Sequence, residues 1–465
     1  MSDINPYSFR EYDIRGIAGK DLTESVVERL GLAFAAHVRS ESGLQNPIVV
    51  TGRDGRASSP GLSKALGRGL SRGGAQVIHV GLGPTPQLYF ANHHFDAHAG
   101  IMITGSHNPP DYNGLKMVRA YKPVFGAEIQ AIKERIIAED YADVDGGSTR
   151  TEDILEIYLA RLVEDYKPGR PVKAILDCGN GAAGVVAQKL LDRLENVTGE
   201  VLFGEVDGTF PNHHPDPTIP ENLVDLKQRM KETNADVGIA FDGDGDRIGA
   251  LDETGQIIWG DRLMILFSRA ILAEKPGVAI IGDVKCSQQL FDAITEAGGE
   301  SIMWKTGHSL VKAKMRESGA AMAGEMSGHL FFADRYYGFD DALYAAVRLV
   351  ELLGAGENAL SSRLADLPEI YSTPELRIEC PDDKKFQVMA RVVEGQRAAG
   401  SDLSDIDGVR VKIGTGWWLM RVSNTQPALV VRAESDSREQ LHEIVDGVAK
   451  ILDAEGVAFP DWQEA

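Results

Sequence analysis

Most of the chain alternates short runs of β-branched and other apolar residues with longer segments whose apolar residues recur every three or four positions. In the first such unit the apolar residues of 26–34 fall at helical spacing, and the strand-like run IVV follows at 48–50. The next helix is predicted to have Ser59 as its N-cap and Pro60 in its first turn. This alternation predicts a largely parallel sheet that is covered by helices on both faces.

The same order of parts occurs three times, which indicates three related domains. The second unit begins near residue 170 with VKAILDC, and the third begins near residue 258 and includes VAIIGDV. Each unit closes with a strand that leads into a dense polar loop: TGSHNP at 104–109, DGDGDR at 242–247 and GEMSGH at 324–329. Ligands of open α/β sheets bind beyond the carboxyl ends of the strands, so we expect these loops to meet at one site.

The chain from about residue 368 follows another pattern. Strands are expected at PELRIEC, DGVRVKIG, WWLMRVS and ALVVRAE, with helices at 384–397 and 437–454, which is typical of an α+β domain whose sheet is antiparallel in part. The predicted fold class is α/β: three similar mixed α/β domains followed by a smaller α+β C-terminal domain, arranged around a central cleft. The expected domains are 1–150, which contains TGSHNP, 151–256, which contains DGDGDR, 257–367, which contains GEMSGH, and 368–465.

Composition and charge narrow the class of protein. A chain of 465 residues is too long for one core, which agrees with several domains. A formal net charge of −21 disfavours non-specific nucleic-acid binding, which depends on Lys and Arg. The three cysteines are far apart and form no CxxC, the N-terminal segment lacks a signal-peptide pattern, and the apolar runs are too short for a membrane span. We therefore expect a cytoplasmic protein without nucleic-acid or membrane partners.

Ser106 lies in the loop TGSHNP, after the strand-like run GIMI. Gly105 permits unusual backbone dihedrals and Pro109 stiffens the exit, so the serine is expected on a constrained turn. A hydroxyl held out in this way can accept a phosphoryl group and divide a transfer into two easier steps. The alternative is a turn whose Ser and Asn side chains bond their own backbone.

Asp242, Asp244 and Asp246 alternate with glycines, and three carboxylates at this spacing can converge on a hard cation. The alternatives are a solvated acidic turn and a calcium EF-hand, since Glu253 falls at the twelfth position of such a loop. Arg247 stands where an EF-hand needs glycine, and the flanking segments have strand patterns. Magnesium serving a phosphoryl group is therefore the favoured hypothesis, with one Mg²⁺ per chain.

Other polar residues suit a phosphorylated sugar. Glu325, Ser327 and His329 alternate acceptors and donors between two glycines, as pyranose hydroxyls require. The segment RVSNTQP offers a bidentate guanidinium, two hydroxyls and the N–H groups of a turn, which are phosphate ligands. Each of these segments alone is also compatible with an ordinary solvated loop. Further basic residues stand near the N-terminus and at strand ends, where an anionic substrate would need them: Arg10, Arg15, Lys285, Lys305 and His308.

The motifs TGSHNP, DGDGDR, GEMSGH and RVSNTQP occur in this order, and together they closely resemble the α-D-phosphohexomutase family. The likeness covers nearly the whole chain, from FREYDIRG onward, and is greatest to the bacterial phosphomannomutase/phosphoglucomutase branch. It implies an isomerase, an intramolecular phosphotransferase that interconverts hexose 1-phosphate and hexose 6-phosphate with mannose or glucose as the sugar. It also implies a phosphoserine at position 106 and a hexose 1,6-bisphosphate intermediate, which also acts as activator and reorients in the cleft.

The roles of individual residues come from two sources. The resemblance implies the Mg²⁺ ligands, the sugar contacts Glu325 and Ser327, with His329 nearby, and the phosphate contacts Arg421, Ser423, Asn424 and Thr425; the other roles are hypotheses from the residues themselves. Ser106, Asp242, Asp244 and Asp246 are expected to bind Mg²⁺, and Arg247 to stabilise charge at the serine. Lys116 and His329 are the candidates for the general base. The expected substrate contacts are Tyr12, Arg15, Lys285, Lys305, Gly307, His308, Glu325, Ser327, His329, Arg421, Ser423, Asn424 and Thr425.

Two other functions remain open on the sequence. A phosphatase would use the same serine and metal with water as acceptor, and a sugar-phosphate sensor would bind ligand without turnover. The partner expected in either case is a small phosphosugar, and the protein is expected to be a monomer or weak dimer.

Overall fold

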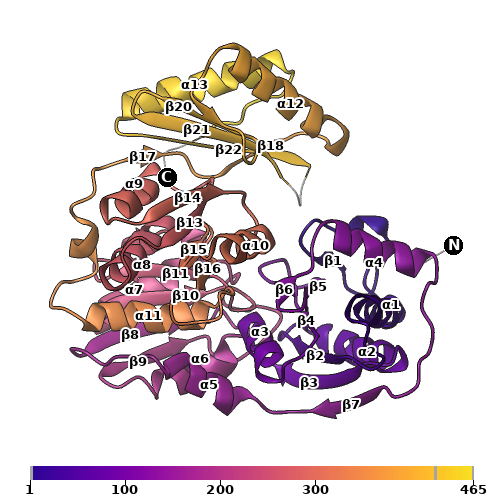
Figure 1. Ribbon diagram of the computed structural model, residues 1–465. Coiled ribbons are helices and arrows are strands. Elements are labelled where there is room, and N and C mark those ends of the chain that lie inside the picture. The colour runs from indigo at the N-terminus through magenta and orange to yellow at the C-terminus, as the bar shows by residue number, and fades with distance from the viewer. Residues whose placement is uncertain (1–3, 424–426, 463–465) are drawn as a thin grey trace.

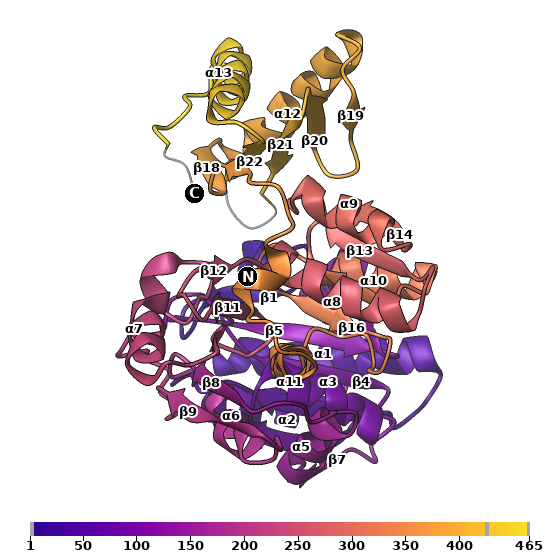
Figure 2. The same ribbon diagram turned by 90° about the vertical axis from the view of Figure 1, so that its left-hand side faces the viewer.

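The computed structural model describes residues 4–423 and 427–462 of the chain. Four sheets follow one another along this part, each with its own helices (Figure 1). The first three units are mixed α/β and the fourth is a smaller α+β unit, as the sequence predicts. The fourth unit, yellow in Figure 1, lies against the third, and Figure 2 shows it standing beyond the other three from a second direction.

The elements of the first unit form a sheet with helices on both faces. Its strands are β1 (Ile14–Ile17), β2 (Ile48–Arg53), β3 (Gln76–Leu82), β4 (Ala99–Ile103), β5 (Tyr112–Arg119), β6 (Lys122–Pro123) and β7 (Ser148–Thr151). Its helices are α1 (Glu24–Ser42), α2 (Ser59–Arg72), α3 (Thr85–His94) and α4 (Ala127–Ile137). The strand order is β1-β5-β4-β2-β3-β7, with β6 paired to β5. Only β2, β3, β4 and β7 are parallel to one another, so the sheet is mixed rather than largely parallel.

The second and third units are smaller versions of this arrangement. The second comprises α5 (Leu155–Val163), β8 (Val172–Asp177), α6 (Gly184–Leu191), β9 (Val197–Leu202), α7 (Val224–Thr233), β10 (Val237–Phe241), β11 (Ile248–Asp252) and β12 (Ile257–Ile258). The third comprises α8 (Gly260–Glu274), β13 (Ala279–Asp283), α9 (Gln288–Glu296), β14 (Glu300–Trp304), α10 (His308–Ser318), β15 (Met322–Gly324), β16 (Leu330–Phe332) and α11 (Ala342–Gly354).

One strand order recurs in all three sheets: β3-β2-β4-β5, β9-β8-β10-β11 and β14-β13-β15-β16. In each, the first three strands are parallel and the last pairs antiparallel with the strand before it. The three polar loops noted in the sequence connect these antiparallel pairs. The repeat therefore places three chemically different loops at equivalent positions.

The fourth unit has an antiparallel sheet throughout its described pairs. Its elements are β17 (Tyr371–Ser372), β18 (Leu376–Glu379), α12 (Asp382–Ala398), β19 (Leu403–Ser404), β20 (Val409–Ile413), β21 (Gly416–Val422), β22 (Ala428–Ser435) and α13 (Arg438–Ala454). The predicted helices at 384–397 and 437–454 match α12 and α13 to within two residues at each end.

The start of α2 differs from the prediction by one residue. The helix begins at Ser59 and its N-cap is Ser58, so the assignment of Ser59 as N-cap is wrong. The Ser59 hydroxyl instead donates to Oδ1 of Asp54 over 2.5 Å, which fastens the loop after β2 to the helix. A loop contact of this kind competes with capping and is not visible in the helical pattern.

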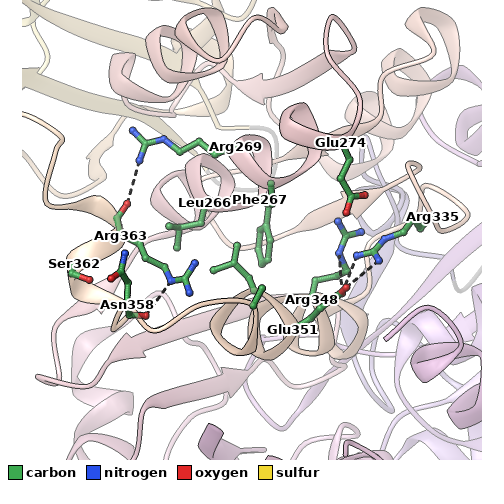
Figure 3. A pocket seen from close by; sticks show the side chains of 13 residues that line it. Leu266, Phe267, Arg269, Glu274, Arg335, Arg348, Glu351, Asn358, Ser362 and Arg363 are labelled. Carbon is green, nitrogen blue, oxygen red and sulfur yellow. Dashed lines mark hydrogen bonds and ion pairs between the residues drawn. The ribbon is translucent and has the colours of Figure 1, made fainter. Parts of the chain in front are cut away.

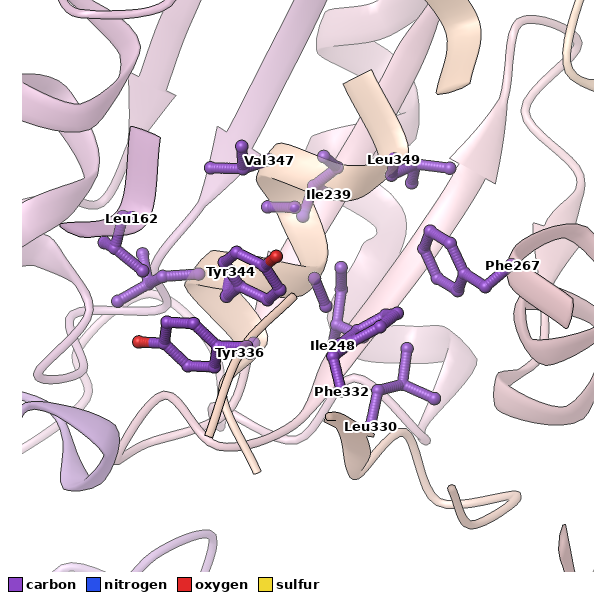
Figure 4. Packing of buried hydrophobic residues seen from close by; sticks show 14 of the residues in the cluster. Leu162, Ile239, Ile248, Phe267, Leu330, Phe332, Tyr336, Tyr344, Val347 and Leu349 are labelled. Carbon is purple, nitrogen blue, oxygen red and sulfur yellow. The ribbon is translucent and has the colours of Figure 1, made fainter. Parts of the chain in front are cut away.

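The first three units share one apolar cluster (Figure 4). It contains Leu88 of α3 in the first unit, Leu162 of α5 and Ile239 of β10 in the second, and Phe332 of β16 and Val347 of α11 in the third. Helix α11 follows the third sheet but also contacts α5 and β8 of the second unit. Each large apolar side chain that is fully buried contributes about 1.5–3 kcal/mol, so this shared core fixes the three sheets relative to one another.

The fourth unit has a core of its own, which includes Trp418 and Leu441. A small separate cluster around Val284, Trp417 and Leu419 joins it to the third unit. The fourth unit is thus held to the others by a smaller apolar contact than the one that joins the first three. No helix in the described residues combines the length and the apolar composition that a membrane span requires.

Candidate active site

Ser106 lies on the loop between β4 and β5 and is only 2 % exposed. Its hydroxyl donates a hydrogen bond to Oδ2 of Asp242 at 3.0 Å and lies 3.2 Å from Nδ1 of His107. The φ angle of Ser106 is +48°, a left-handed conformation that is uncommon for residues with a side chain. Such conformations persist only where the surrounding structure holds them, and they cluster at functional sites.

The guanidinium of Arg56 holds the serine loop in this conformation. Nη2 donates to the carbonyl oxygens of Ser106 at 2.7 Å and Asn108 at 2.6 Å. Nη1 donates to those of Pro109 at 2.5 Å and Tyr112 at 3.1 Å. One buried guanidinium therefore binds four carbonyl oxygens at once, which its planar arrangement of N–H donors allows. Arg56 had no predicted role, and its one signal in the sequence is its place in the polar segment TGRDGR at 51–56, after the strand-like run IVV.

The three aspartates of the next loop, between β10 and β11, are fully buried. Oδ1 of Asp242 accepts hydrogen bonds from the backbone N–H groups of Asp246 at 3.0 Å and Arg247 at 3.1 Å, which close the turn. A Cβ atom on Gly243 would lie 2.3 Å from the carbonyl oxygen of Ser106. The glycine is therefore needed for the close approach of the aspartate loop to the serine loop.

Lys116 of β5 inserts its ammonium among these carboxylates. Nζ donates to Oδ2 of Asp244 at 2.8 Å and also to Oδ2 of Asp246. Burial opposes the charge of Lys116, but the attraction of the aspartates outweighs it and raises the pKa of the amine. Burial and repulsion from the other two carboxylates raise the pKa of Asp242 well above its usual range. The attraction of Arg247 and Lys116 does not offset these effects, so the charge of Asp242 is unfavourable in the folded protein.

The aspartate cluster fits a small divalent cation. One oxygen from each of Asp242, Asp244 and Asp246 can be chosen so that all three lie within 4.8 Å of one another. Oδ1 of Asp244 is buried and has no hydrogen-bond partner within the described parts of the chain. Buried carboxylate oxygens normally have partners, and oxygen ligands at this spacing suit a hard cation. The loop joins two strands rather than two helices, so the EF-hand alternative is not supported.

Glu325, Ser327 and His329 lie on the loop between β15 and β16. Oε1 of Glu325 accepts the backbone N–H of Gly307 at 2.5 Å, and Oε2 pairs with Nδ1 of His329 at 2.6 Å. Burial opposes the charge of Glu325, but the pairing with His329 prevails and lowers its pKa to about 2. Burial also opposes the charge of His329, whereas Asp246 attracts it, and its pKa rises to about 9. Ser327 is half-buried.

Arg247 and His329 connect the aspartate loop with the predicted sugar-binding loop at 324–329 (below, the sugar loop). Their backbones form an isolated antiparallel bridge, and the N–H of Ile248 donates to the carbonyl of Gly328 at 3.0 Å. Nε2 of His329 lies 3.3 Å from Oδ1 of Asp246 and also 3.3 Å from Nε of Arg247. The carboxylates of Asp246 and Glu325 both pair with the ring of His329 and favour its charged form, which carries a proton on each nitrogen. In that form Nε2 cannot accept a hydrogen bond from Arg247. The four predicted catalytic residues, Ser106, Lys116, Arg247 and His329, thus form one connected network.

Two predicted ligands near the N-terminus also reach this region. The Tyr12 hydroxyl donates to the carbonyl oxygen of Thr306 at 3.1 Å, which links the first and third units. Arg15 pairs with Asp13 at 2.5 Å and donates from Nη1 to Oδ1 of Asn108 at 3.2 Å. Arg15 therefore lies beside the serine loop.

Three predicted substrate-binding residues of the third unit, Lys285, Lys305 and His308, differ in burial and in their contacts. Nδ1 of His308 lies 3.6 Å from Oδ2 of Asp340, a buried carboxylate that the sequence analysis did not identify. Nζ of Lys285 donates to Glu375 at 3.1 Å. Lys305 is exposed, and among the described residues none hydrogen-bonds to its ammonium. The structure thus brings His308 and Lys285 inward but leaves Lys305 at the surface.

The predicted phosphate loop lies in the fourth unit, after β21. Nε of Arg421 donates to Oδ2 of Asp407 at 2.8 Å. Ser423 is buried at the end of the strand. Asn424 and Thr425 lie outside the described residues.

A cavity of about 500 Å³ lies elsewhere, between α8, α11 and the segment that follows α11 (Figure 3). Four arginines line it, and three of them are paired with carboxylates: Arg269 with Asp366, Arg335 with Glu351, and Arg348 with Asp334. None of the predicted site residues lines this cavity. The candidate active site is therefore the region where the loops 104–109, 242–247 and 324–329 meet.

Comparisons with known proteins agree with this organisation. Models of the phosphoglucomutase/phosphomannomutase family match α/β/α domain I at residues 6–143, domain II at 156–255, domain III at 259–371 and the C-terminal domain at 375–451. Together these matches cover most of the chain.

Individual relatives are similar over nearly their whole length. A phosphomannomutase/phosphoglucomutase of Pseudomonas aeruginosa is 46 % identical over 436 residues, which cover 94 % of this chain and 93 % of the relative. A phosphoglucomutase of Neisseria gonorrhoeae is 43 % identical over 457 residues, with 98 % of both chains covered. The crystal structure of a phosphoglucomutase/phosphomannomutase family protein from Burkholderia thailandensis has a TM-score of 0.91 and 43 % identity, covering 98 % of this chain and 100 % of that one.

These likenesses define the protein as an enzyme, an isomerase that acts as a hexose-phosphate mutase. The chain belongs to the phosphoglucomutase/phosphomannomutase family of α-D-phosphohexomutases, as its four motifs indicate. The phosphatase and sensor alternatives find no support among these relatives, which are named as mutases.

Proposed function

We propose that Ser106 is the phosphoryl carrier of this mutase and that the reaction passes through hexose 1,6-bisphosphate. The observation that supports this most strongly is the hydrogen bond from Ser106 to Asp242, which places a buried hydroxyl on a strained turn beside three carboxylates. A serine in this position divides the transfer between two sugar oxygens into two steps. The substrate class is a hexose phosphate, with mannose or glucose as the sugar.

Ser106 begins the cycle as a phosphoserine. In the first step the bond from phosphorus to Oγ of Ser106 breaks, a bond from phosphorus to the free hydroxyl oxygen of the hexose 1-phosphate forms, and Oγ takes up a proton. The proton of that hydroxyl passes to a base, and the product is the bisphosphate. The bisphosphate then reorients. The bond from its other phosphorus to the sugar oxygen breaks, a bond from that phosphorus to Oγ of Ser106 forms, the Oγ proton passes to a base, and the sugar oxygen takes up a proton to give hexose 6-phosphate. Phosphoryl transfer requires chiefly alignment and charge stabilisation, and the rigid serine loop provides the alignment.

Asp242, Asp244 and Asp246, together with Ser106, are the residues that would hold one Mg²⁺. Bound there, Mg²⁺ would neutralise the charge of the transferring phosphoryl group. The crowded carboxylates and the unpaired Oδ1 of Asp244 support this assignment. Arg247, whose backbone N–H donates to Asp242, adds a second positive charge near the serine.

Lys116 and His329 remain the candidates for the general base. Both hold a proton in the substrate-free protein, because neighbouring carboxylates raise the pKa of each. A cation bound by Asp244 and Asp246 would offset the attraction that holds the proton on Lys116, so that the ammonium could lose this proton to solvent. The amine is then free to accept the proton of the sugar hydroxyl.

The remaining contacts would hold the substrate in either orientation. Glu325 and Ser327 would bind sugar hydroxyls, with Tyr12, Arg15, Gly307 and His308 around them. Lys285, Lys305, Arg421 and Ser423 would hold the phosphate that is not reacting, together with Asn424 and Thr425. Because both ends of the intermediate use this pocket in turn, the site is expected to accept both 2-epimers, glucose and mannose.

We also propose domain limits at 1–150, 151–256, 257–367 and 368–465, a cytoplasmic location, and a monomer or weak dimer. The ranges matched by the family models support the domain limits, although the third range extends to residue 371. The three buried, free cysteines suit a reducing compartment.

Phosphoryl transfer to the chain tests the carrier directly. The protein is incubated with glucose 1,6-bisphosphate and Mg²⁺, and its peptides are mapped by mass spectrometry. We expect one added phosphoryl group on Ser106, absent from Ser106→Ala. A phosphoryl group on another residue would refute the assignment, and rapid release of inorganic phosphate without isomerisation would indicate a phosphatase.

A further inference from the structure

The turn at 405–408, between β19 and β20 of the fourth unit, contacts the third unit. Ile406 packs against the apolar cluster that includes Val284 and Trp417. Gly408 has a φ of +76°, and a Cβ there would lie 2.7 Å from Cα of Arg421. The turn is therefore fitted closely between the third unit and the backbone of the predicted phosphate-binding arginine.

Asp407 lies between Ile406 and Gly408 in this turn. One of its carboxylate oxygens accepts hydrogen bonds from both the third and the fourth unit. Oδ2 accepts a hydrogen bond from Nε of Arg421 at 2.8 Å. The same oxygen accepts the backbone N–H of Thr306, in the third unit, at 3.1 Å. The side chain of Asp407 is 18 % exposed, so the two bonds are largely shielded from water.

Thr306 is a junction of three units. Its N–H donates to Asp407 of the fourth unit, and its carbonyl accepts the hydroxyl of Tyr12 from the first. Its own hydroxyl donates to Oδ2 of Asp283 at 2.8 Å within the third unit. The next residue is Gly307, whose N–H donates to Glu325 of the sugar loop. A continuous path of hydrogen bonds and backbone thus connects Arg421 to the residue proposed to bind the sugar.

The bond at Nε also orients the guanidinium of Arg421. A guanidinium is planar, so fixing Nε fixes the direction of the two terminal nitrogens. In residues 4–423 and 427–462, Nη1 and Nη2 of Arg421 have no hydrogen-bond partner. These two nitrogens form the edge that binds a phosphate through two parallel hydrogen bonds.

We propose that Asp407 is a positioning residue that aims Arg421 at the phosphate of the substrate and couples that phosphate to the sugar loop through Thr306. The proposal rests on the proposed function, in which Arg421 holds the phosphate that is not reacting. That phosphate is bound alike in the ground state and the transition state. If Arg421 is no longer oriented by Asp407, KM is therefore expected to rise while kcat stays nearly unchanged.

Asp407→Asn tests the proposal, because it keeps the size of the side chain and removes its charge. A hydrogen bond to a charged group stabilises by about 1.5–3 kcal/mol, so KM is expected to rise by about tenfold or more. We expect the same rise for glucose 1-phosphate and glucose 6-phosphate, since both orientations use Arg421. The change in kcat is expected to stay within about threefold. Should the Asn variant not fold, Asp407→Glu, which displaces the carboxylate by one methylene, is expected to raise KM in the same direction.

The matched control is Asp405→Asn, in the same turn. Asp405 is exposed and pairs with Arg397 of α12, away from Arg421. This variant is expected to keep the wild-type KM and kcat. Equal KM values for the two Asn variants would overturn the proposal, as would a loss of kcat and thermal stability in Asp407→Asn without a rise in KM.

A double-mutant cycle separates action through Arg421 from a general effect on the fold. Arg421→Lys has no Nε donor and no fork, so Asp407→Asn is expected to change KM little in that background. Full additivity of the two changes would contradict the proposal. Absence of mutase activity in the wild type would refute the proposed function instead, so the two failures are distinguishable.

Discussion

The hydroxyl of Ser106 donates to Oδ2 of Asp242 at 3.0 Å, although the two residues are 136 positions apart and belong to different sheets. The bond requires that the first two units share a core and that both loops leave their sheets in the same direction. The repeated strand order and the common apolar cluster meet these requirements.

Replacing Asp242 by Asn is expected to stabilise the protein in the absence of Mg²⁺. Burial and the neighbouring carboxylates raise the pKa of Asp242, so its charge is unfavourable in the folded state. We expect the unfolding temperature in EDTA to rise by about 2–4 °C, and the stabilisation by added Mg²⁺ to be lost. Differential scanning fluorimetry with and without Mg²⁺ measures both effects. A lower unfolding temperature in EDTA together with a normal Mg²⁺ response would contradict the metal assignment.

Arg56→Lys is expected to lower kcat by about 10–100-fold, because an ammonium cannot gather the four carbonyl groups that fix the serine loop. The effect on KM should be smaller, since Arg56 does not face the substrate. Steady-state kinetics provide the test. Arg53→Lys is the control, because Arg53 is near in sequence but bonds only the carbonyl of Asp54 among the described residues. Equal kcat values for the two variants would show that the hydrogen bonds from Arg56 to the serine loop are not needed for turnover.

Lys116→Met is expected to lower turnover by about 100-fold or more while Mg²⁺ binds more tightly. The ammonium now competes with a cation for Asp244 and Asp246, and methionine removes that competition. Isothermal titration calorimetry and the mutase assay measure the two effects separately. Unchanged turnover would remove Lys116 from the role of base, and weaker Mg²⁺ binding would show that it does not compete for the aspartates.

Asp341 is expected to make stability depend on pH. It caps α11, accepts the hydroxyls of Tyr158 and Tyr336 at 2.9 Å each, and burial raises its pKa to about 7. Because its folded pKa exceeds its unfolded value, the folded state holds an extra proton between about pH 4 and 7, and the free energy of unfolding falls as pH rises through that window. Asp341→Asn, which also caps helices well, should weaken this dependence and be relatively more stable at pH 8 than at pH 5. Parallel pH profiles for wild type and variant in thermal unfolding would contradict the assignment.

The site residues that the sequence indicated are those that lie in short, contiguous motifs. Ser106, the three aspartates and Glu325 each stand in a dense polar loop after an apolar strand, and a strand pattern followed by glycine-rich polar residues is visible without a structure. The repeat of these parts also predicted three related units and a different fourth one, which the sheets and the family models confirm.

Residues that act through long-range backbone contacts were not predictable. Arg56 bonds carbonyl oxygens, and Thr306 bonds through its own backbone, so neither contact depends on a distinctive pattern of residue types. Asp407 lies in an ordinary turn, and only the docking of the fourth unit brings it to Arg421. The sheet of the first unit was expected to be largely parallel, because a periodicity of two does not reveal that β5 returns antiparallel to β4.

The central claim is that Ser106 transfers the phosphoryl group, and the most direct measurement is turnover of mannose 1-phosphate and glucose 1-phosphate to the 6-phosphates. The assay contains Mg²⁺ and a trace of glucose 1,6-bisphosphate and compares wild type with Ser106→Ala. We predict conversion of both sugars by wild type and a loss of roughly a thousandfold or more in the variant. Equal activity of the two proteins, or no conversion of either sugar by wild type, would contradict the account.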